Sequence, residues 1–97
     1  MSDWLVYMIR CSDDSLYTGI TNNVERRIRQ HVQLRGARYF RARKPQQLVY
    51  VELGHDRSSA SKREAQIKSL DRCGKVRLVR SAQNEISSLA GVNTDLG

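Results

Sequence analysis

The feature that most constrains the fold of this chain is an apolar segment, a tight polar turn and a second short strand pattern near its N-terminus. Residues 4–9 are almost continuously apolar, as in a central strand that is covered on both faces. The polar run 12–15 predicts a turn, and residues 16–20 resume the strand pattern, so the two strands should form a hairpin. Gly19 is typical of a bulge or of a close approach to the backbone.

A helix should follow the hairpin directly. An asparagine with a glutamate three residues later is a helix-start pattern, and it predicts a helix over residues 23–33. At 100° per residue, Arg27 and His31 lie beside the apolar Val24 and Ile28. Both polar side chains therefore border the side of the helix that packs on the sheet, whereas a solvated charge would more naturally lie on the other side.

The rest of the chain predicts one more strand and two more helices, so we expect a single small α+β domain over residues 1–82. A loop over 34–46, with one helical turn, precedes a strand over 48–53, a helix over 59–71 capped by Asp56 or Ser58, and a short basic helix over 75–82. Residues 83–97 are polar and contain glycine, and we expect them to form a frayed tail.

Glu64 lies within the apolar stripe of the helix predicted over 59–71, which is formed by Ala60, Ile67 and the flanking Leu70. Burying a carboxylate without a partner is costly, so Glu64 should face a cation or a metal ion. Lys68, one turn later on the same side, offers the simpler explanation of an ordinary helical ion pair.

The charge of the chain favours an anionic partner. The 97 residues carry a net charge of +7, and nucleic acid is the commonest partner of such chains, although a ribosome-associated or membrane-surface protein would have a similar charge. Residues 26–44 contain eight Lys or Arg, no acid, and two aromatic residues. This block suits a phosphate backbone with exposed bases; the alternative is a solvated surface. The candidate nucleic-acid contacts are Arg26, Arg35, Arg38, Arg41, Arg43, Lys44 and Lys68.

The location of the protein is predicted from what its sequence lacks. Cys11 and Cys73 form no metal-binding motif, so they are interpreted as reduced thiols of a cytosolic protein. No apolar run reaches the roughly 20 residues of a membrane span, and the N-terminus does not have the layout of a signal peptide. We therefore expect a cytoplasmic protein without a membrane partner.

Five residues in order along the chain indicate an active site. Tyr7 and Tyr17 on paired strands, Arg27 and His31 on the next helix, and Glu64 on a later one would each be structural if taken singly. Together they suit phosphodiester hydrolysis, because an arginine can hold phosphate oxygens through its planar fork and a single carboxylate can hold a hard divalent ion.

These residues resemble the GIY-YIG nuclease superfamily, and most closely its small single-domain bacterial members. The first motif of the family matches residues 5–7 and the second matches residues 17–19. Leu5 replaces the glycine and Thr18 the isoleucine of the motif names, while both tyrosines stay in place. The helix arginine, the residue four positions after it and the metal-binding glutamate match Arg27, His31 and Glu64.

The resemblance implies both a fold and an activity. It implies a small three-stranded antiparallel sheet flanked by helices, and phosphodiester hydrolysis in DNA or RNA assisted by one divalent metal, Mg²⁺ or Mn²⁺, on Glu64. It also implies Tyr17 as the general base with Tyr7 or His31 assisting, although the residues alone do not rank these three. The alternative is a nucleic-acid-binding module that keeps the fold with little or no turnover. A protein-interaction domain would explain neither the charge nor Glu64.

Overall fold

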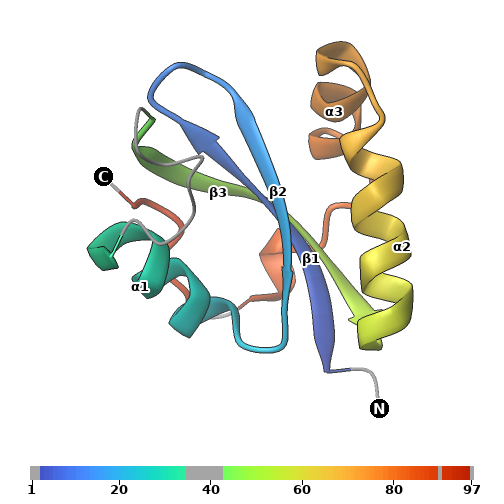
Figure 1. The fold of residues 1–97 in the computed structure, drawn as a ribbon, viewed down its shortest axis with the longest axis horizontal. Coiled ribbons are helices and arrows are strands. Elements are labelled where there is room, and N and C mark those ends of the chain that lie inside the picture. The colour runs from blue at the N-terminus through green and yellow to red at the C-terminus, as the bar shows by residue number, and fades with distance from the viewer. Residues whose placement is uncertain (1–2, 35–42, 90, 97) are drawn as a thin grey trace.

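The computed structural model describes residues 3–34, 43–89 and 91–96. The chain forms a three-stranded sheet with a helix on one face and two on the other (Figure 1). The elements in chain order are β1 (Trp4–Cys11), β2 (Leu16–Thr21), α1 (Val24–Leu34), β3 (Pro45–His55), α2 (Arg57–Lys68), α3 (Arg72–Val79) and a short 3₁₀ turn, η2 (Ile86–Ser88).

The sheet has the order β2-β1-β3, and both neighbours pair with β1 antiparallel. This confirms the predicted hairpin and the three-stranded antiparallel sheet. β1 is the central strand, as its continuous apolar run predicted, because a strand covered on both faces has no polar side to present to water. α1 lies on one face of the sheet, while α2 and α3 lie on the other (Figure 1).

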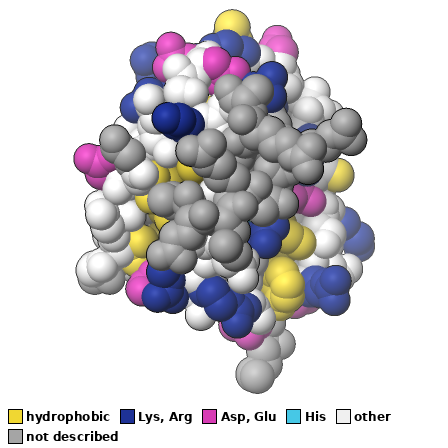
Figure 2. All heavy atoms as spheres, turned by 60° about the vertical axis from the view of Figure 1, so that its left-hand side comes forward, with side chains coloured by type: hydrophobic (Ala, Val, Ile, Leu, Met, Phe, Trp, Pro, Cys, Tyr) yellow, Lys and Arg dark blue, Asp and Glu magenta, His cyan; other side chains and the backbone are white. Residues whose placement is uncertain are grey.

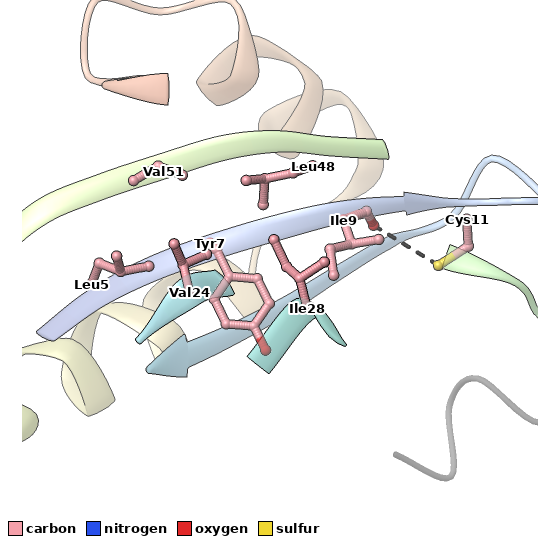
Figure 3. Packing of buried hydrophobic residues seen from close by; sticks show 8 residues of the cluster. All are labelled: Leu5, Tyr7, Ile9, Cys11, Val24, Ile28, Leu48 and Val51. Carbon is pink, nitrogen blue, oxygen red and sulfur yellow. Dashed lines mark hydrogen bonds between the residues drawn. The ribbon is translucent and has the colours of Figure 1, made fainter. Parts of the chain in front are cut away.

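Alternate residues of β1 build two separate hydrophobic cores, because successive side chains of a strand point to opposite faces. On the α1 side, Figure 3 shows Tyr7 beside the helix residues Val24 and Ile28, in a core that also contains Leu5, Ile9, Cys11, Leu48 and Val51. On the other side, the core consists of Val6, Met8, Tyr50, Ala60, Ile67 and Leu78. Cys11 is buried and Cys73 is exposed, and both are free thiols.

The later elements differ from the prediction at their ends, and the helix caps explain why. α2 begins at Arg57 because Asp56 is its N-cap: the Asp56 carboxylate accepts the Ser59 backbone N–H at 2.8 Å, and the Ser59 hydroxyl accepts the Asp56 N–H at 3.1 Å. α3 begins at Arg72, three residues earlier than predicted. Its cap, Asp71, accepts the backbone N–H of Gly74 at 2.8 Å, so the glycine expected to separate two helices lies inside the first turn.

The C-terminal segment differs from the frayed tail expected over 83–97. Its backbone bonds to β3 at three places: Glu85 N–H to Val51 C=O, Leu48 N–H to Thr94 C=O, and Leu96 N–H to Gln46 C=O, at 2.7–2.8 Å. The aliphatic residues of the segment, spaced among polar ones, pack on the α1-side core; they are Ile86, Leu89, Val92 and Leu96. An open strand edge offers hydrogen bonds that composition does not reveal. The domain boundary at residue 82 stays a prediction.

Candidate active site

The structure brings together the four candidate catalytic residues that lie far apart in the sequence. The hydroxyl of Tyr7 on β1 is hydrogen-bonded to Nε2 of His31 on α1 at 2.8 Å, and both side chains are 1% exposed. The ring of Tyr17 on β2 lies edge-on to His31, with centroids 5.5 Å apart, and 6.4 Å from the ring of Tyr7. Arg27 interacts with both tyrosines.

The absence of a side chain at Gly19 makes room for the ring of Tyr7. The two residues face each other across the β1–β2 register. A Cβ added to Gly19 would lie 2.5 Å from the Tyr7 hydroxyl oxygen and 2.6 Å from its Cζ. The phenol of Tyr7 therefore occupies the space that any side chain at position 19 would need, as the predicted close approach to this glycine required.

The start of α1 sets the phase of its two functional residues. The Asn23 side chain accepts the backbone N–H of Arg26 at 3.1 Å, so Asn23 caps the helix, where the sequence pattern had started one residue earlier. Val24 and Ile28 are buried against the sheet. Because residues three and four positions apart share a helix face, Arg27 and His31 are brought to the tyrosines.

Arg27 lies at the electrostatic centre of this cluster. Burial raises the pKa of Tyr7, the charges of Tyr17 and Glu64 add to the increase, and hydrogen bonding and charge from Arg27 oppose it. Hydrogen bonding to Tyr7 is the main cause that raises the pKa of Arg27; burial acts against it, and Tyr17 contributes further. The guanidinium is therefore placed to stabilise negative charge on either phenol oxygen.

His31 is neutral at physiological pH. Burial, and then the positive charge of Arg27, lower the pKa of His31 from 6.5 to about 4. A neutral imidazole can accept a proton, and its Nε2 is already hydrogen-bonded to the Tyr7 hydroxyl. The pair therefore offers a short path for proton transfer between β1 and α1.

Glu64 approaches the cluster from α2, which covers the other face of the sheet. Its side chain is 25% exposed and pairs with Lys68 at 3.4 Å, so the cation expected beside this carboxylate is present. Ala60 and Ile67 are fully buried as predicted, whereas Leu70 is 39% exposed and lies outside the stripe. The charge of Glu64 contributes to the raised pKa of Tyr7, so the carboxylate is within electrostatic reach of the tyrosines.

The donor set suits a hard divalent ion that keeps most of its water ligands. Within the described ranges, no group of three or more His, Cys, Asp or Glu side chains gathers to hold a metal. Mg²⁺ needs no such group, because it commonly binds one or two carboxylates together with water and substrate phosphates. Glu64, partly exposed and within electrostatic reach of Tyr7, fits that role.

The candidate nucleic-acid contacts are only partly visible in the structure. Arg26 and Lys44 are exposed. Arg43 forms an ion pair with Asp13 at 2.7 Å, and Lys68 is paired with Glu64. Figure 2 shows Lys and Arg side chains at several places on the face that carries α1. Three further candidates lie outside the described residues: Arg35, Arg38 and Arg41.

A second polar cluster, not anticipated from the sequence, joins β3 to α2. Glu52 accepts the Tyr50 hydroxyl at 2.5 Å and Nε of Arg63 at 3.0 Å, and it bonds to His55 Nε2 at 2.7 Å. Burial opposes ionisation of Glu52, but these hydrogen bonds outweigh it and lower the pKa of the carboxyl. The cluster fixes the helix that carries Glu64. The signal for it was a glutamate two residues after the inward-facing Tyr50, on the same strand face.

Comparison with known proteins decides the family. A profile of the GIY-YIG catalytic domain matches residues 3–76. The chain belongs to the GIY-YIG family. The match includes all five candidate residues, which confirms the resemblance expected from the two tyrosine motifs.

Relatives of similar small size occur in bacteria and archaea. A UPF0213 protein of Desulfotalea psychrophila is 48% identical over 87 residues, which cover 89% of this chain and 79% of that protein. A UPF0213 protein of Natronomonas pharaonis is 49% identical over 78 residues, 80% of this chain and 92% of that protein. The solution NMR structure of a UPF0213 protein from Bacillus halodurans has a TM-score of 0.54 at 34% identity, covering 94% and 97% of the two chains. The GIY-YIG fold is therefore shown.

Proposed function

We propose that this GIY-YIG protein is a metal-dependent endonuclease that hydrolyses phosphodiester bonds in DNA, or alternatively in RNA. The observation that carries the proposal is the convergence of Tyr7, Tyr17, Arg27 and His31 in one cluster, joined by hydrogen bonds and by edge-on and tilted ring contacts. A packing role for two tyrosines would not need an arginine shared between them or a neutral histidine on the hydroxyl of Tyr7. Glu64 then supplies the anionic ligand that hydrolysis requires.

Arg27 is the residue that would bind the scissile phosphate of the substrate. Its planar fork suits two phosphate oxygens, and such donors act where negative charge builds up in the transition state. Arg27 also interacts with Tyr7 and with Tyr17, so one cation serves both the substrate and the tyrosine pair. We assign it the largest single contribution to the rate.

Tyr17 is the proposed general base. It is partly exposed, so a water molecule can reach it, whereas Tyr7 is buried on His31. The Arg27 guanidinium interacts with Tyr17 as well as with Tyr7, so a positive charge lies beside the proposed base. Tyr7 and His31 are then positioning residues, which hold Arg27 and Tyr17 in place and can exchange a proton at the Tyr7 hydroxyl.

Glu64 would hold the divalent ion, Mg²⁺ or Mn²⁺. When bound, such an ion neutralises charge on the phosphate and on the leaving oxygen. Lys68 neutralises the carboxylate in its absence. Because the protein provides one carboxylate, the remaining ligands would be water and the substrate itself.

The substrate class rests on charge as well as on the cluster. The net charge of +7 attracts a polyanion, and the exposed Arg26 and Lys44 are available for phosphate contacts. In the described part of the chain no helix is long and apolar enough to cross a membrane. Phosphate contacts carry no sequence information, so we expect cleavage without a long recognition site.

The alternative is a nucleic-acid-binding module that keeps the fold with little or no turnover. A cleavage screen separates the two functions. Single-stranded, duplex, branched and damaged DNA, together with RNA, are incubated with Mg²⁺, Mn²⁺ or EDTA. We expect cleavage of at least one substrate with a metal and none with EDTA. Binding without cleavage of any substrate under these conditions would favour the module.

A further inference from the structure

A hollow of about 190 Å³ lies between the β1–β2 turn and α3. Its lining comes from two distant parts of the chain, Ser15 and Leu16 on one side and Arg72 and Lys75 on the other. Arg72 Nη1 donates to the backbone carbonyl of Asp14, so the turn and the helix are joined where the hollow lies. None of these residues belongs to the basic block or to the proposed reaction centre.

The two basic side chains of the hollow have donors to spare. Lys75 is half-buried, and among the described residues it has no ion-pair partner. A guanidinium carries five N–H donors, so the bond from Arg72 to the turn leaves others for a ligand. An anion in the hollow would therefore meet two cations, one of which, Arg72, is already held in place by its bond to the turn.

The carboxylates near the hollow are each engaged elsewhere. Asp13 pairs with Arg43 at 2.7 Å. Asp14 pairs with Arg10 at 3.4 Å. Asp71 caps α3 through a backbone N–H. The charges of Asp13 and Asp14 are balanced by their arginine partners, and the hollow itself is lined by the cations Arg72 and Lys75, which suit a phosphate group.

The hollow adjoins the proposed reaction centre along β2. Leu16 lines the hollow, and the next residue is Tyr17; a strand advances about 3.3 Å per residue. Neighbouring side chains of a strand point to opposite faces, so the hollow and the tyrosine cluster lie on either side of the same strand. In the described part of the chain, β2 has a strand partner on one side only. A nucleic-acid strand that crosses this open edge can reach both places.

We propose that the hollow binds a backbone phosphate of the substrate, close to the phosphate that is cleaved. This inference rests on the proposed function and adds the path of the substrate: across the edge of β2, from Arg27 on the α1 side to Lys75 on the α3 side. It gives α3 a role as a second anchor, which would hold the scissile phosphate in register with Tyr17.

Binding as a function of salt tests the anchor. Lys75→Gln and its matched control Lys62→Gln, which removes an exposed lysine of α2 outside the hollow, are compared in the Glu64→Gln background so that no cleavage occurs. The probes are a short single-stranded DNA and a duplex of unrelated sequence. We expect Lys75→Gln to reduce the slope of log affinity against log salt by about 0.7 for the single strand or 0.9 for the duplex. The control should leave the slope unchanged.

Neutral methylphosphonate linkages placed one at a time along the single strand locate the contact. With Lys75 present, one linkage should weaken binding; with Lys75→Gln the same linkage should have a smaller effect, because only Arg72 remains to contact that phosphate. Lys75→Arg should restore the slope, and melting temperatures confirm that each variant is folded. Equal slopes for Lys75→Gln and Lys62→Gln would overturn the anchor while nucleic-acid binding itself stands. A parent protein that binds no nucleic acid would overturn the proposed function as well.

Discussion

The phenol of Tyr7 fills the space above Gly19. Tyr7 can lie there only because Gly19 has no side chain. An added Cβ would lie 2.5 Å from the Tyr7 hydroxyl oxygen, far inside van der Waals contact. The same hydroxyl is hydrogen-bonded to His31 at 2.8 Å. The glycine of the second motif is thus connected, through Tyr7, to the helix that carries the arginine.

We therefore predict that Gly19→Ala damages the site. Tyr7 must move to admit the methyl group, which breaks its hydrogen bond to His31. Overpacking of this kind costs about 1–3 kcal/mol, and a misplaced catalytic group can cost about 100-fold in rate. Chemical denaturation and cleavage assays measure the two effects. Gly54→Ala is the control. An alanine at the φ of +79° found at Gly54 strains the backbone, but its Cβ meets no atom within 4 Å. This variant should lose stability and keep its cleavage activity.

The depressed pKa of His31 predicts a loss of stability in mild acid. The unfolded chain takes up a proton at this histidine near pH 6.5, whereas the folded protein keeps it neutral down to about pH 4. Between these values the unfolded state binds more protons, so the stabilisation is complete above pH 6.5 and is lost as pH falls through about 4. The full difference is about 3 kcal/mol.

Denaturant unfolding at a series of pH values measures this loss. His31→Gln should flatten the plot of unfolding free energy against pH between pH 6.5 and 4. His55→Gln, which changes the only other histidine, should keep most of the pH dependence. A curve of the same steepness in His31→Gln would assign the acid sensitivity to other groups.

We predict that Arg27→Ala lowers cleavage by about two to three orders of magnitude, as removal of a transition-state donor does. Arg29→Ala should have a much smaller effect. Arg27 interacts with both tyrosines, whereas Arg29 is exposed and lines a separate cavity between α1 and the C-terminal segment. Turnover rates at saturating substrate compare the two. Equal losses would mean that both arginines act only as general positive charge.

Glu64→Gln should abolish cleavage and leave nucleic-acid binding intact or slightly tighter. Glutamine keeps the size of the side chain but is a poor ligand for a hard divalent ion, and loss of a negative charge does not weaken phosphate binding. Melting temperature and cleavage in Mg²⁺ or Mn²⁺ are measured on one preparation. If the glutamate serves only its ion pair with Lys68, the variant would instead melt earlier and still cleave near the wild-type rate.

Affinity for unrelated sequences should fall steeply with salt. Each phosphate contact contributes about −0.9 to the slope of log affinity against log salt on duplex DNA and about −0.7 on single strands. We expect such contacts because residues 26–44 contain eight Lys or Arg and no acidic residue. Fluorescence anisotropy over a salt series measures the slope. A flat response, or a strong preference for one duplex sequence, would contradict binding through phosphates.

Local pattern was enough to predict much of this fold. Period-2 and period-3.6 spacing of apolar residues predicts the hairpin, the order of strands and helices, and the phase of Arg27 and His31 on α1. Such spacing is a local property of the sequence. The motif residues could be named for the same reason, since their spacing is written in the chain. The helix starts were less accurate: the sequence offered Asp56 or Ser58 as the cap of α2, where the capping box on Asp56 decides the start, and the cap of α3 by Asp71 was not anticipated.

Only the tertiary structure decided how those residues meet. The neutral state of His31 depends on burial and on Arg27, and the position of Tyr7 depends on a glycine across the sheet. The C-terminal segment pairs with β3 because that strand leaves an open edge, not because its own composition favours order. Burial, charge proximity and edge pairing are relations between distant parts of the chain, and they appear only once the chain has folded.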